Sequence, residues 1–319
     1  MRTDVRRSAR DAGFRHDVLF YAGVDGFVDR ISAFIRDALA VGEPILVVVS
    51  GEKIDRLRRE LGGEPDGVRF ADMMQVGRNP ARIIPAWRDF VSEHATSGRG
   101  FRGIGEPLWE ARSADELVEC ARHEALLNLA FVGAPAWWLA CPYDTESLSS
   151  AVLAEAARNH PWVMDGGERR VSETYRGLGD VARPFADPLP EPGGRAREFR
   201  FGSDAESLAA LRLRVREAAA AFGLDPARTG DLVLVVNEVA TNSVRHGGGA
   251  GTLRIWEEDT SVICEISDSG QILDPLAGRR KPPADRGSGF GLWLANELCD
   301  LVQIRSFPSG SVVRLHVRR

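Results

Sequence analysis

Apolar positions in the first half of the chain alternate between continuous runs and runs at helical spacing. Residues 18–21 and 45–49 are continuous apolar runs, typical of strands covered on both faces. Between them, Phe27, Ile31 and Ile35 recur at the spacing of a helix. The alternation continues through residues 68–71, 87–91, 104, 117–131 and 137–140. Repeated strands and helices predict an α/β domain with a mostly parallel sheet and helices on both faces.

The second half of the chain carries its strands and helices in a different order. Strands are expected at residues 198–201, 253–257, 262–268, 302–307 and 311–317, with the last two paired as a hairpin. Helical spacing predicts one helix around Leu211 and Val215, a second over residues 227–246 and a third from about residue 291. This order predicts an α+β sandwich with helices on one face of a mainly antiparallel sheet. On the last strand, His316 falls on the polar side and is expected to be solvated.

Between these halves, residues 163–196 lack periodicity. Prolines at positions 184, 188, 190 and 192 precede a Gly-Gly pair, a composition typical of a linker that is stiff and then flexible. A chain of 319 residues also suits two cores. We therefore expect a first domain over residues 14–162, a linker over 163–196 and a second domain over 197–319.

Composition excludes several classes of protein. Hydrophobic residues make up 44% and charged residues 27%, a balance typical of globular proteins. A net charge of -5 offers no general basic surface for nucleic acid. No apolar stretch approaches the roughly 18 residues of a membrane span, and no signal-peptide core follows the basic N-terminus. We therefore expect a cytoplasmic protein that binds neither nucleic acid nor membrane directly. The cysteines lack metal or redox spacing and are expected to be buried thiols: Cys120, Cys141, Cys264 and Cys299.

The helix over residues 227–246 carries polar groups beside its apolar stripe. Glu238, Asn242 and His246 lie at positions i, i+4 and i+8, on one edge of the helix. An amide oxygen is a suitable Mg²⁺ ligand, and a carboxylate one turn away can accept a proton from an attacking hydroxyl. The alternative is a solvated helix edge.

The strand over residues 262–268 ends with a carboxylate on its apolar face. Strand alternation places Asp268 on the same side as Cys264 and Ile266. A carboxylate directed at a core needs a partner, and the exocyclic amine of adenine would supply one. Gly270 would let the backbone approach the base. The alternative is an ordinary Asp-Ser-Gly turn.

A glycine-rich segment precedes the third helix. Gly287, Gly289 and Gly291 leave bare amide groups at a helix N-terminus, where phosphate groups bind readily. The dinucleotide fingerprint is poorly matched, because these glycines follow a loop rich in Pro and Arg instead of a buried strand.

Together, the segments NEVATNSVRHG, DSG and GSGFGL resemble the N, G1 and G2 boxes of the GHKL ATPases, over residues 197–319. The resemblance implies a Bergerat-type fold that binds ATP with Mg²⁺. It makes Glu238 the catalytic base, Asn242 the Mg²⁺ ligand and Asp268 the adenine-binding acid. It also implies that these residues contact ATP: Asn242, His246, Asp268, Gly270, Gly287, Ser288, Gly289, Gly291 and Leu292.

Within this superfamily the chain is similar to the anti-sigma factor serine kinases. A histidine kinase needs a phospho-accepting histidine just before its ATPase, and residues 161–245 contain none. His123 lies far upstream, and Pro161 directly after His160 ends any helix there. The resemblance implies a protein that binds a sigma factor and phosphorylates a serine of a STAS-domain anti-anti-sigma partner.

Several alternatives stay open at this stage. The chain could be an orphan histidine-kinase-like sensor ATPase, or an interaction module that binds nucleotide without catalysis. Whether the chain forms a homodimer is also open. The basic cluster of Arg279, Arg280, Lys281 and Arg286 departs from the closest pattern; it either holds ATP phosphates or forms a solvated loop.

Residues 14–162 resemble the MEDS sensory domain, a RecA-like relative found in bacterial regulators. The segments FRGIGEPLW and ECARHEALLN carry this resemblance. It implies a sensor of small organic or hydrocarbon-derived compounds. Glu106, Glu110 and Glu124 are candidates for a ligand or metal crevice at the strand ends, where open α/β sheets usually bind. The alternative is that they are surface carboxylates and helix caps.

Overall fold

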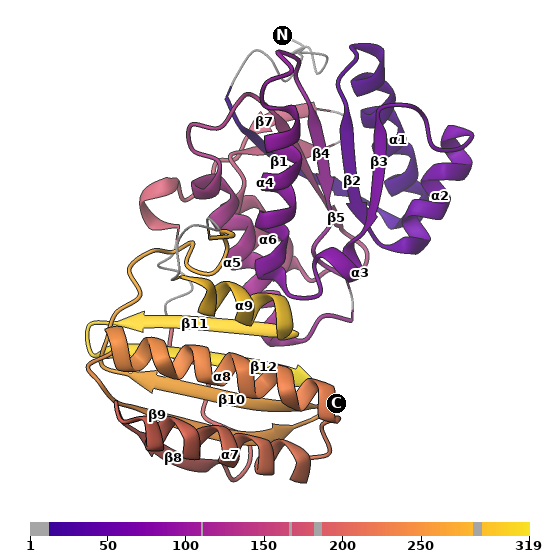
Figure 1. The fold of residues 1–319 in the computed structure, drawn as a ribbon. Helices are drawn as coiled ribbons and strands as arrows, with labels where there is room; N and C mark the ends of the chain where they lie inside the picture. The colour runs from indigo at the N-terminus through magenta and orange to yellow at the C-terminus, as the bar shows by residue number, and fades with distance from the viewer. Residues whose placement is uncertain (1–12, 110, 166–167, 182–186, 283–288) are drawn as a thin grey trace. The chain divides into compact units, whose positions relative to one another are not determined.

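Two compact units make up the chain, residues 1–182 and residues 183–319 (Figure 1). The computed structural model describes residues 13–109, 111–165, 168–181, 187–282 and 289–319. Each unit has its own sheet and its own cluster of buried apolar side chains. Each is therefore built around a separate core.

The first unit contains a seven-stranded sheet in the order β3-β2-β4-β5-β1-β6-β7 (Figure 1). Neighbouring strands run parallel except for β6 and β7. This confirms the expected mostly parallel sheet. The strands are β1 (Arg15–Tyr21), β2 (Ile45–Val49), β3 (Val68–Asp72), β4 (Arg102–Gly105), β5 (Trp138–Asp144), β6 (Trp162–Asp165) and β7 (Glu168–Val171).

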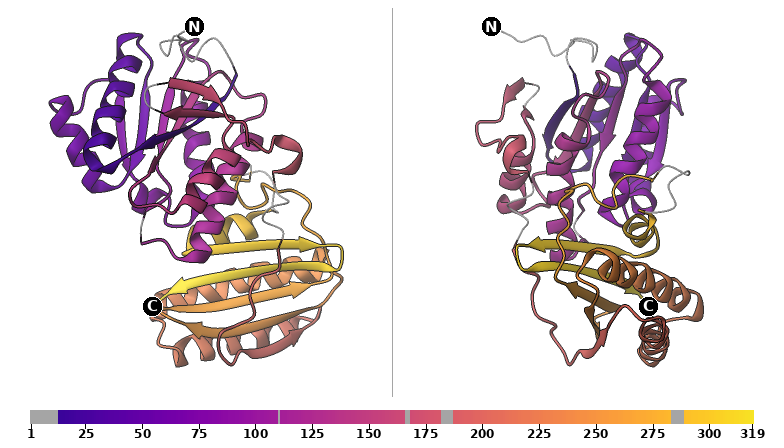
Figure 2. Two further views of the ribbon diagram at one scale, coloured as in Figure 1. Left: turned by 180° about the vertical axis from the view of Figure 1, so that it is seen from behind. Right: turned by 60° about the vertical axis from the view of Figure 1, so that its left-hand side comes forward.

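Helices cover both faces of this sheet (Figure 2). The helices α1 and α2 pack Phe27 and Leu57 into the core on the face that carries Tyr21. The helix α5 contacts the opposite face, where Glu124 meets His16. The helices are α1 (Gly23–Ala40), α2 (Gly51–Leu61), α3 (Met73–Val76), α4 (Ile83–His94), α5 (Ala114–Ala130) and α6 (Ser150–Asn159), with 3-10 turns η2 (Pro80–Arg82) and η3 (Leu178–Asp180).

The second unit contains a five-stranded antiparallel sheet in the order β11-β12-β10-β9-β8. Its helices pack on one face, where Leu232 and Val236 meet Cys264 and Leu315 in a common core (Figure 1). This confirms the expected α+β sandwich and its terminal hairpin. The elements are β8 (Arg197–Phe201), α7 (Ala205–Ala221), α8 (Pro226–His246), β9 (Gly251–Glu258), β10 (Ser261–Asp268), α9 (Phe290–Leu298), β11 (Leu301–Phe307) and β12 (Gly310–Arg318).

The segment expected to be a linker begins with regular structure. The strand β6 pairs in parallel with β1, and β7 pairs in antiparallel with β6. The expectation of a linker is therefore wrong for residues 163–165 and 168–171. Val163 and Met164 of β6 are buried. A strand of four residues is nevertheless too short to show a clear period of apolar positions in the sequence.

The later part of that segment is bound to the second unit by arginine side chains. Arg314 donates to the carbonyl of Pro190 at 2.6 Å, and Arg305 donates to the carbonyl of Asp187 at 3.2 Å. Arg254 pairs with Glu191 at 2.6 Å. Hydrogen bonds from charged donors are stronger than those between neutral groups. These contacts therefore hold residues 187–191 along the sheet of the second unit.

His316 is buried, and the expectation that it is solvated is wrong. The residue is 9% exposed, and Nε2 lies 3.0 Å from Oε1 of Gln303, to which it donates a hydrogen bond. Burial, with a further contribution from the positive charge of Arg314, lowers the pKa of His316 to about 3. Strand alternation predicts which face a side chain occupies, but it does not show what covers that face.

We expect His316 to make the protein less stable as the pH falls from about 6.5 towards 3. In this window the unfolded state takes up a proton on this ring and the folded state does not, because its folded pKa is depressed. The unfolding free energy should therefore rise with pH by up to about 1.4 kcal/mol per pH unit from this group. Urea unfolding of the wild type and His316→Gln across this range tests it. Equal pH slopes in both proteins would contradict the assignment.

Candidate functional site

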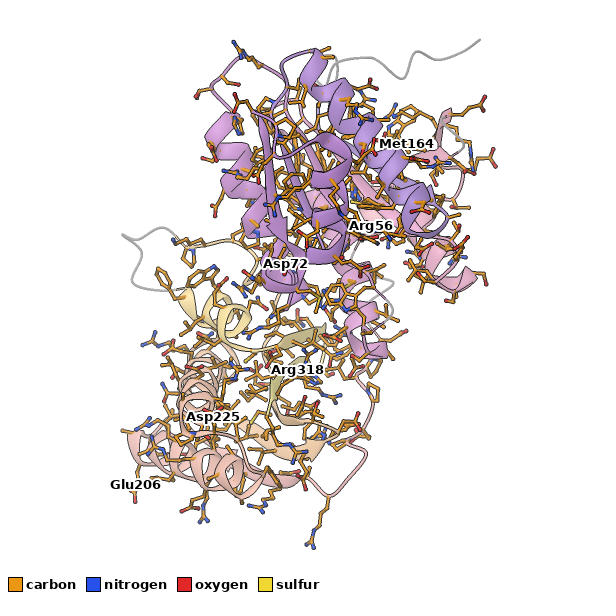
Figure 3. All side chains as sticks on the ribbon, turned by 90° about the vertical axis from the view of Figure 1, so that its right-hand side faces the viewer. Arg56, Asp72, Met164, Glu206, Asp225 and Arg318 are labelled. Carbon is orange, nitrogen blue, oxygen red and sulfur yellow. The ribbon has the colours of Figure 1, made fainter. Side chains whose placement is uncertain are left out.

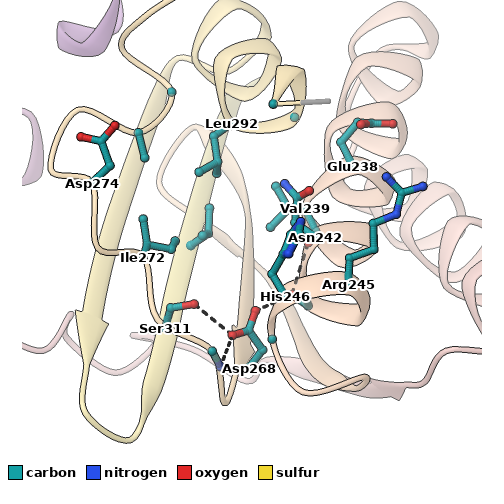
Figure 4. A pocket seen from close by; sticks show the side chains of 18 of the residues that line it. Glu238, Val239, Asn242, Arg245, His246, Asp268, Ile272, Asp274, Leu292 and Ser311 are labelled. Atoms are coloured by element: carbon teal, nitrogen blue, oxygen red, sulfur yellow. Dashed lines mark hydrogen bonds between the residues drawn. The ribbon is translucent and has the colours of Figure 1, made fainter. Parts of the chain in front are cut away.

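A cavity of about 590 Å³ lies in the second unit, between α8, the end of β10 and the start of α9 (Figure 4). Its lining includes every described residue to which the sequence assigned a role in binding nucleotide. Gly287 and Ser288, predicted for the same site, lie outside the described residues. The predicted residues around the cavity are Glu238, Asn242, His246, Asp268, Gly270, Gly289, Gly291 and Leu292.

The helix α8 supplies the first group of polar side chains. Asp225, labelled in Figure 3, caps its N-terminus by accepting hydrogen bonds from two backbone amides. Pro226 follows at the first helical position. The buried apolar stripe of α8 faces the sheet, and Glu238 and Asn242 beside it lie half-buried at the edge of the cavity. His246, at the end of the helix, is exposed.

Gly291 brings the start of α9 close to this edge of α8. A Cβ atom at this position would lie 2.8 Å from Nδ2 of Asn242 and 3.4 Å from Cβ of Glu238. Gly289, directly before the first residue of α9, has a φ of 97°, a conformation that favours glycine. The backbone of this segment therefore approaches the two polar side chains more closely than a side chain would allow.

Three donors hold the carboxylate of Asp268 at the other end of the cavity (Figure 4). The hydroxyl of Ser243 donates to Oδ2 at 2.6 Å. The amide of Gly270 and the hydroxyl of Ser311 donate to Oδ1 at 2.9 and 3.0 Å. An ionised carboxylate has about four acceptor sites, so Asp268 is fixed in orientation and keeps capacity for one further donor.

The sequence did not single out Gly247, Ser243 or Ser311. A Cβ atom on Gly247 would lie 2.7 Å from both carboxylate oxygens of Asp268. The three glycines directly after His246 were a signal for this close contact. The two serines gave no local signal, because each meets Asp268 from another element. Ser243 is on α8, and Ser311 is on β12, which pairs with β10.

We expect Gly247→Ala to lower the unfolding free energy by about 1–3 kcal/mol, the usual cost of overpacking, and to weaken nucleotide binding by displacing Asp268. The matched control is Gly230→Ala in α8, where a Cβ atom would meet nothing within 4 Å. That control should raise stability by about 0.5–1 kcal/mol, because alanine is the better helix former. Urea unfolding of both variants measures the difference; a neutral Gly247→Ala would contradict the close packing.

Positive charges also line this cavity. Arg245 and Arg280 belong to the lining. Arg280 comes from the basic cluster predicted either to hold phosphates or to be solvated. Of the other members, Arg279 is buried, Lys281 is exposed and Arg286 lies outside the described residues.

Of the three carboxylates proposed as a crevice in the first unit, the two that the structure describes, Glu106 and Glu124, are not brought together. Glu106 accepts hydrogen bonds from Lys53, at 2.7 and 2.8 Å, and from Tyr21. Burial raises the pKa of Glu106, and the ammonium of Lys53 opposes this rise. Glu124 instead contacts His16, five residues before Tyr21 on β1 and therefore on the opposite face of the sheet. Glu110 lies outside the described residues.

No helix among the described residues is long and apolar enough to cross a membrane. No curated protein matches the chain. A crystal structure of the RsbU and RsbW domains of a Mycobacterium tuberculosis protein is 20% identical, with a TM-score of 0.31; the match covers 39% of this chain and 32% of that one. The histidine kinase AdeS of Acinetobacter baumannii is 18% identical, with a TM-score of 0.20; the match covers 39% of this chain and 68% of that one.

Two family models match the chain, one in each unit. Residues 15–161 match MEDS, the MEthanogen/methylotroph, DcmR Sensory domain. Residues 201–317 match the histidine kinase-like ATPase domain. The chain therefore consists of an N-terminal MEDS domain followed by a C-terminal histidine kinase-like ATPase domain.

Proposed function

We propose that the second unit binds ATP with Mg²⁺ in this cavity and transfers the γ-phosphoryl group to a serine of a partner protein. The observation that carries the proposal is the convergence of Glu238, Asn242, Asp268 and Gly291 on one cavity. Its volume of about 590 Å³ is in the usual range for small-molecule sites.

The two ends of the cavity suit the two ends of the nucleotide. Asp268 presents a fixed acceptor at one end, which matches the exocyclic amine of adenine. Glu238 lies two turns before His246 along α8, roughly 12 Å away at 1.5 Å per residue. The start of α9 lies beside Glu238, and a helix N-terminus favours bound phosphate groups.

In the proposed reaction the serine oxygen forms a bond to the γ-phosphorus, and the bond from that phosphorus to the bridging oxygen of ADP breaks. Glu238 accepts the hydroxyl proton, and Asn242 would hold the metal through its amide oxygen. Bound Mg²⁺ would neutralise charge on the phosphates. Arg245 and Arg280 add positive charge along the lining.

The partner in this proposal is a STAS-domain anti-anti-sigma protein, and the same unit holds or releases a sigma factor. The MEDS domain would control this exchange in response to a small organic ligand. The histidine kinase alternative is less well supported, because His123 and His160 are 1% and 0% exposed and no kinase could reach them in the folded protein.

The test is to incubate the full chain with Mg-ATP labelled at the γ-phosphate and with purified STAS-domain proteins. We expect label on a partner serine, stable to acid and lost in base. Label on a histidine of this chain, which is lost in acid, would favour the histidine-kinase-like alternative. Nucleotide binding without transfer to any partner would favour the interaction module.

A further inference from the structure

A second cluster of polar side chains lies in the core of the MEDS domain. His16, Glu124, Cys141 and His160 each offer one ligand atom, and these atoms all lie within 4.8 Å of one another. None of the four residues is more than 1% exposed. Buried polar groups of this kind need partners, so the way in which they satisfy one another is informative.

The sheet topology brings these residues together from distant parts of the sequence. The strands β5, β1 and β6 are neighbours, and Val18 pairs with Cys141. His16 lies two residues before Val18 and therefore on the same face as Cys141. His160 lies two residues before Trp162, which begins β6, and Glu124 reaches the same face from α5.

Hydrogen bonds fix the tautomer of both imidazole rings. Nδ1 of His160 lies 2.8 Å from the backbone carbonyl of Ala156, which can only accept, so this nitrogen carries a proton. Nδ1 of His16 lies 3.1 Å from Oδ1 of Asn128. The amide nitrogen of Asn128 donates to the carbonyl of Asn159 at 2.8 Å, which makes Oδ1 the acceptor for His16. Both rings therefore direct Nε2 into the cluster.

These two nitrogens meet a single carboxylate oxygen. Nε2 of His16 and Nε2 of His160 each lie 3.1 Å from Oε2 of Glu124. The contact of His160 does not have the geometry of a hydrogen bond. Sγ of Cys141 lies 3.4 Å from Nε2 of His16. Four ligand atoms thus surround one point, and protons do not satisfy all of them.

Charge balance disfavours a cluster held by protons alone. If both Nε2 atoms were protonated, two imidazolium rings with centroids 4.0 Å apart would share one carboxylate in a fully buried site. If one ring were neutral, the lone pair on its Nε2 would face the lone pairs of the carboxylate oxygen, and the two would repel each other. A divalent cation removes both conflicts: two neutral imidazoles, one carboxylate and one thiolate carry a charge of -2, which the ion offsets.

We propose that His16, Glu124, Cys141 and His160 form a buried tetrahedral site for a divalent transition metal, for which Zn²⁺ is the best chemical fit. Zinc takes nitrogen and oxygen ligands at about 2.0–2.1 Å and sulfur at about 2.3 Å, which puts neighbouring ligand atoms roughly 3.3–3.6 Å apart. Three of the six separations between ligand atoms are 3.1 to 3.4 Å, close to this spacing, and all six are within 4.8 Å.

The surroundings match a structural zinc site. Zinc-bound histidines usually donate their other ring N–H to a carbonyl or carboxylate, as His16 and His160 do here. Four protein ligands leave no open position, which is typical of structural and not catalytic zinc. Binding releases the thiol proton of Cys141 to solvent. The ion would then link β1, β5, α5 and the start of β6, and would stabilise the fold of the sensory domain.

The first experiment uses the full chain without an affinity tag. After incubation with Zn²⁺ and desalting, we expect about one zinc ion per chain by mass spectrometry, and a lower melting temperature after chelation. Replacement by Co²⁺ should give the intense visible bands of a tetrahedral site and a thiolate-to-metal charge-transfer band. Wild-type protein with no bound zinc, or with Co²⁺ but no charge-transfer band, would overturn the proposal.

Variants then identify the ligands. Cys141→Ser should lose the charge-transfer band, and His160→Gln should lose stoichiometric zinc. The matched control is Cys120→Ser, a buried thiol on α5 that donates to the carbonyl of Pro107 and lies outside the cluster. It should keep the metal and the spectrum. A folded Cys141→Ser with an unchanged spectrum would reject the site. If that variant does not fold, the wild-type cobalt spectrum still decides.

Discussion

Glu238→Gln is expected to slow phosphoryl transfer to a STAS-domain serine by roughly 10²–10⁴-fold, the usual contribution of a general base. Glutamine keeps the size and polarity of the side chain but cannot take up the serine proton. Asp268 and Asn242 are unchanged in this variant, so the affinity for Mg-ATP should stay within a few-fold of the wild type. Transfer rates with labelled ATP, together with calorimetric titration, separate the two effects.

The matched control for this variant is Glu217→Gln. Glu217 is an exposed carboxylate on α7 and does not line the cavity, so its transfer rate should equal that of the wild type. Transfer at the wild-type rate by Glu238→Gln would reject Glu238 as the base. Equal and negligible rates in the wild type and the variant, with ATP still bound, would identify an interaction module without catalysis.

Asp268→Asn is expected to weaken Mg-ATP binding by about 30-fold or more. Loss of one partner in a buried, charged hydrogen bond costs about 2–5 kcal/mol, and each 1.4 kcal/mol is about tenfold in affinity. Ser243 donates to one carboxylate oxygen, and Gly270 and Ser311 donate to the other. The amide nitrogen of asparagine cannot accept from either side, so one donor loses its partner and the adenine-facing acceptor is disturbed. Calorimetric titration measures the loss.

Two comparisons show whether the loss of affinity comes from the contact with adenine. Ser311→Ala removes one of the three donors and leaves the carboxylate in place, so its effect should be several-fold smaller. The wild type should also prefer ATP to GTP, because guanine presents an acceptor where adenine presents its amine. Equal affinity of the wild type and Asp268→Asn for ATP would show that this carboxylate does not bind adenine.

Local patterns predicted the regular elements because each depends on nearby residues. The apolar stripe of Leu232, Val236 and Val239 marked α8, and alternation along residues 262–268 marked β10. Both elements lie close to their expected bounds. The order and spacing of three motifs also predicted which side chains would surround the cavity, since motifs on neighbouring elements of a compact unit converge when that unit folds.

The short strands β6 and β7 were missed for the opposite reason. Four residues are too few to establish a period, and β6 is held in the sheet by its pairing with β1, about 145 residues earlier in the chain. The predicted grouping of Glu106 with Glu124 was wrong because the two carboxylates lie on opposite faces of the sheet. Glu106 meets Tyr21 on one face, and Glu124 reaches His16 on the other from α5.

The sequence by itself thus determined the two fold classes, the core-facing stripes and the side chains around the cavity of the second unit, because these follow from periods of a few residues and from motif spacing. Only the tertiary structure decided that His316 is buried, that serines hold Asp268, and that His16, Glu124, Cys141 and His160 meet. Those contacts join residues far apart in the chain, and strand pairing and helix packing bring them together. No local period encodes them.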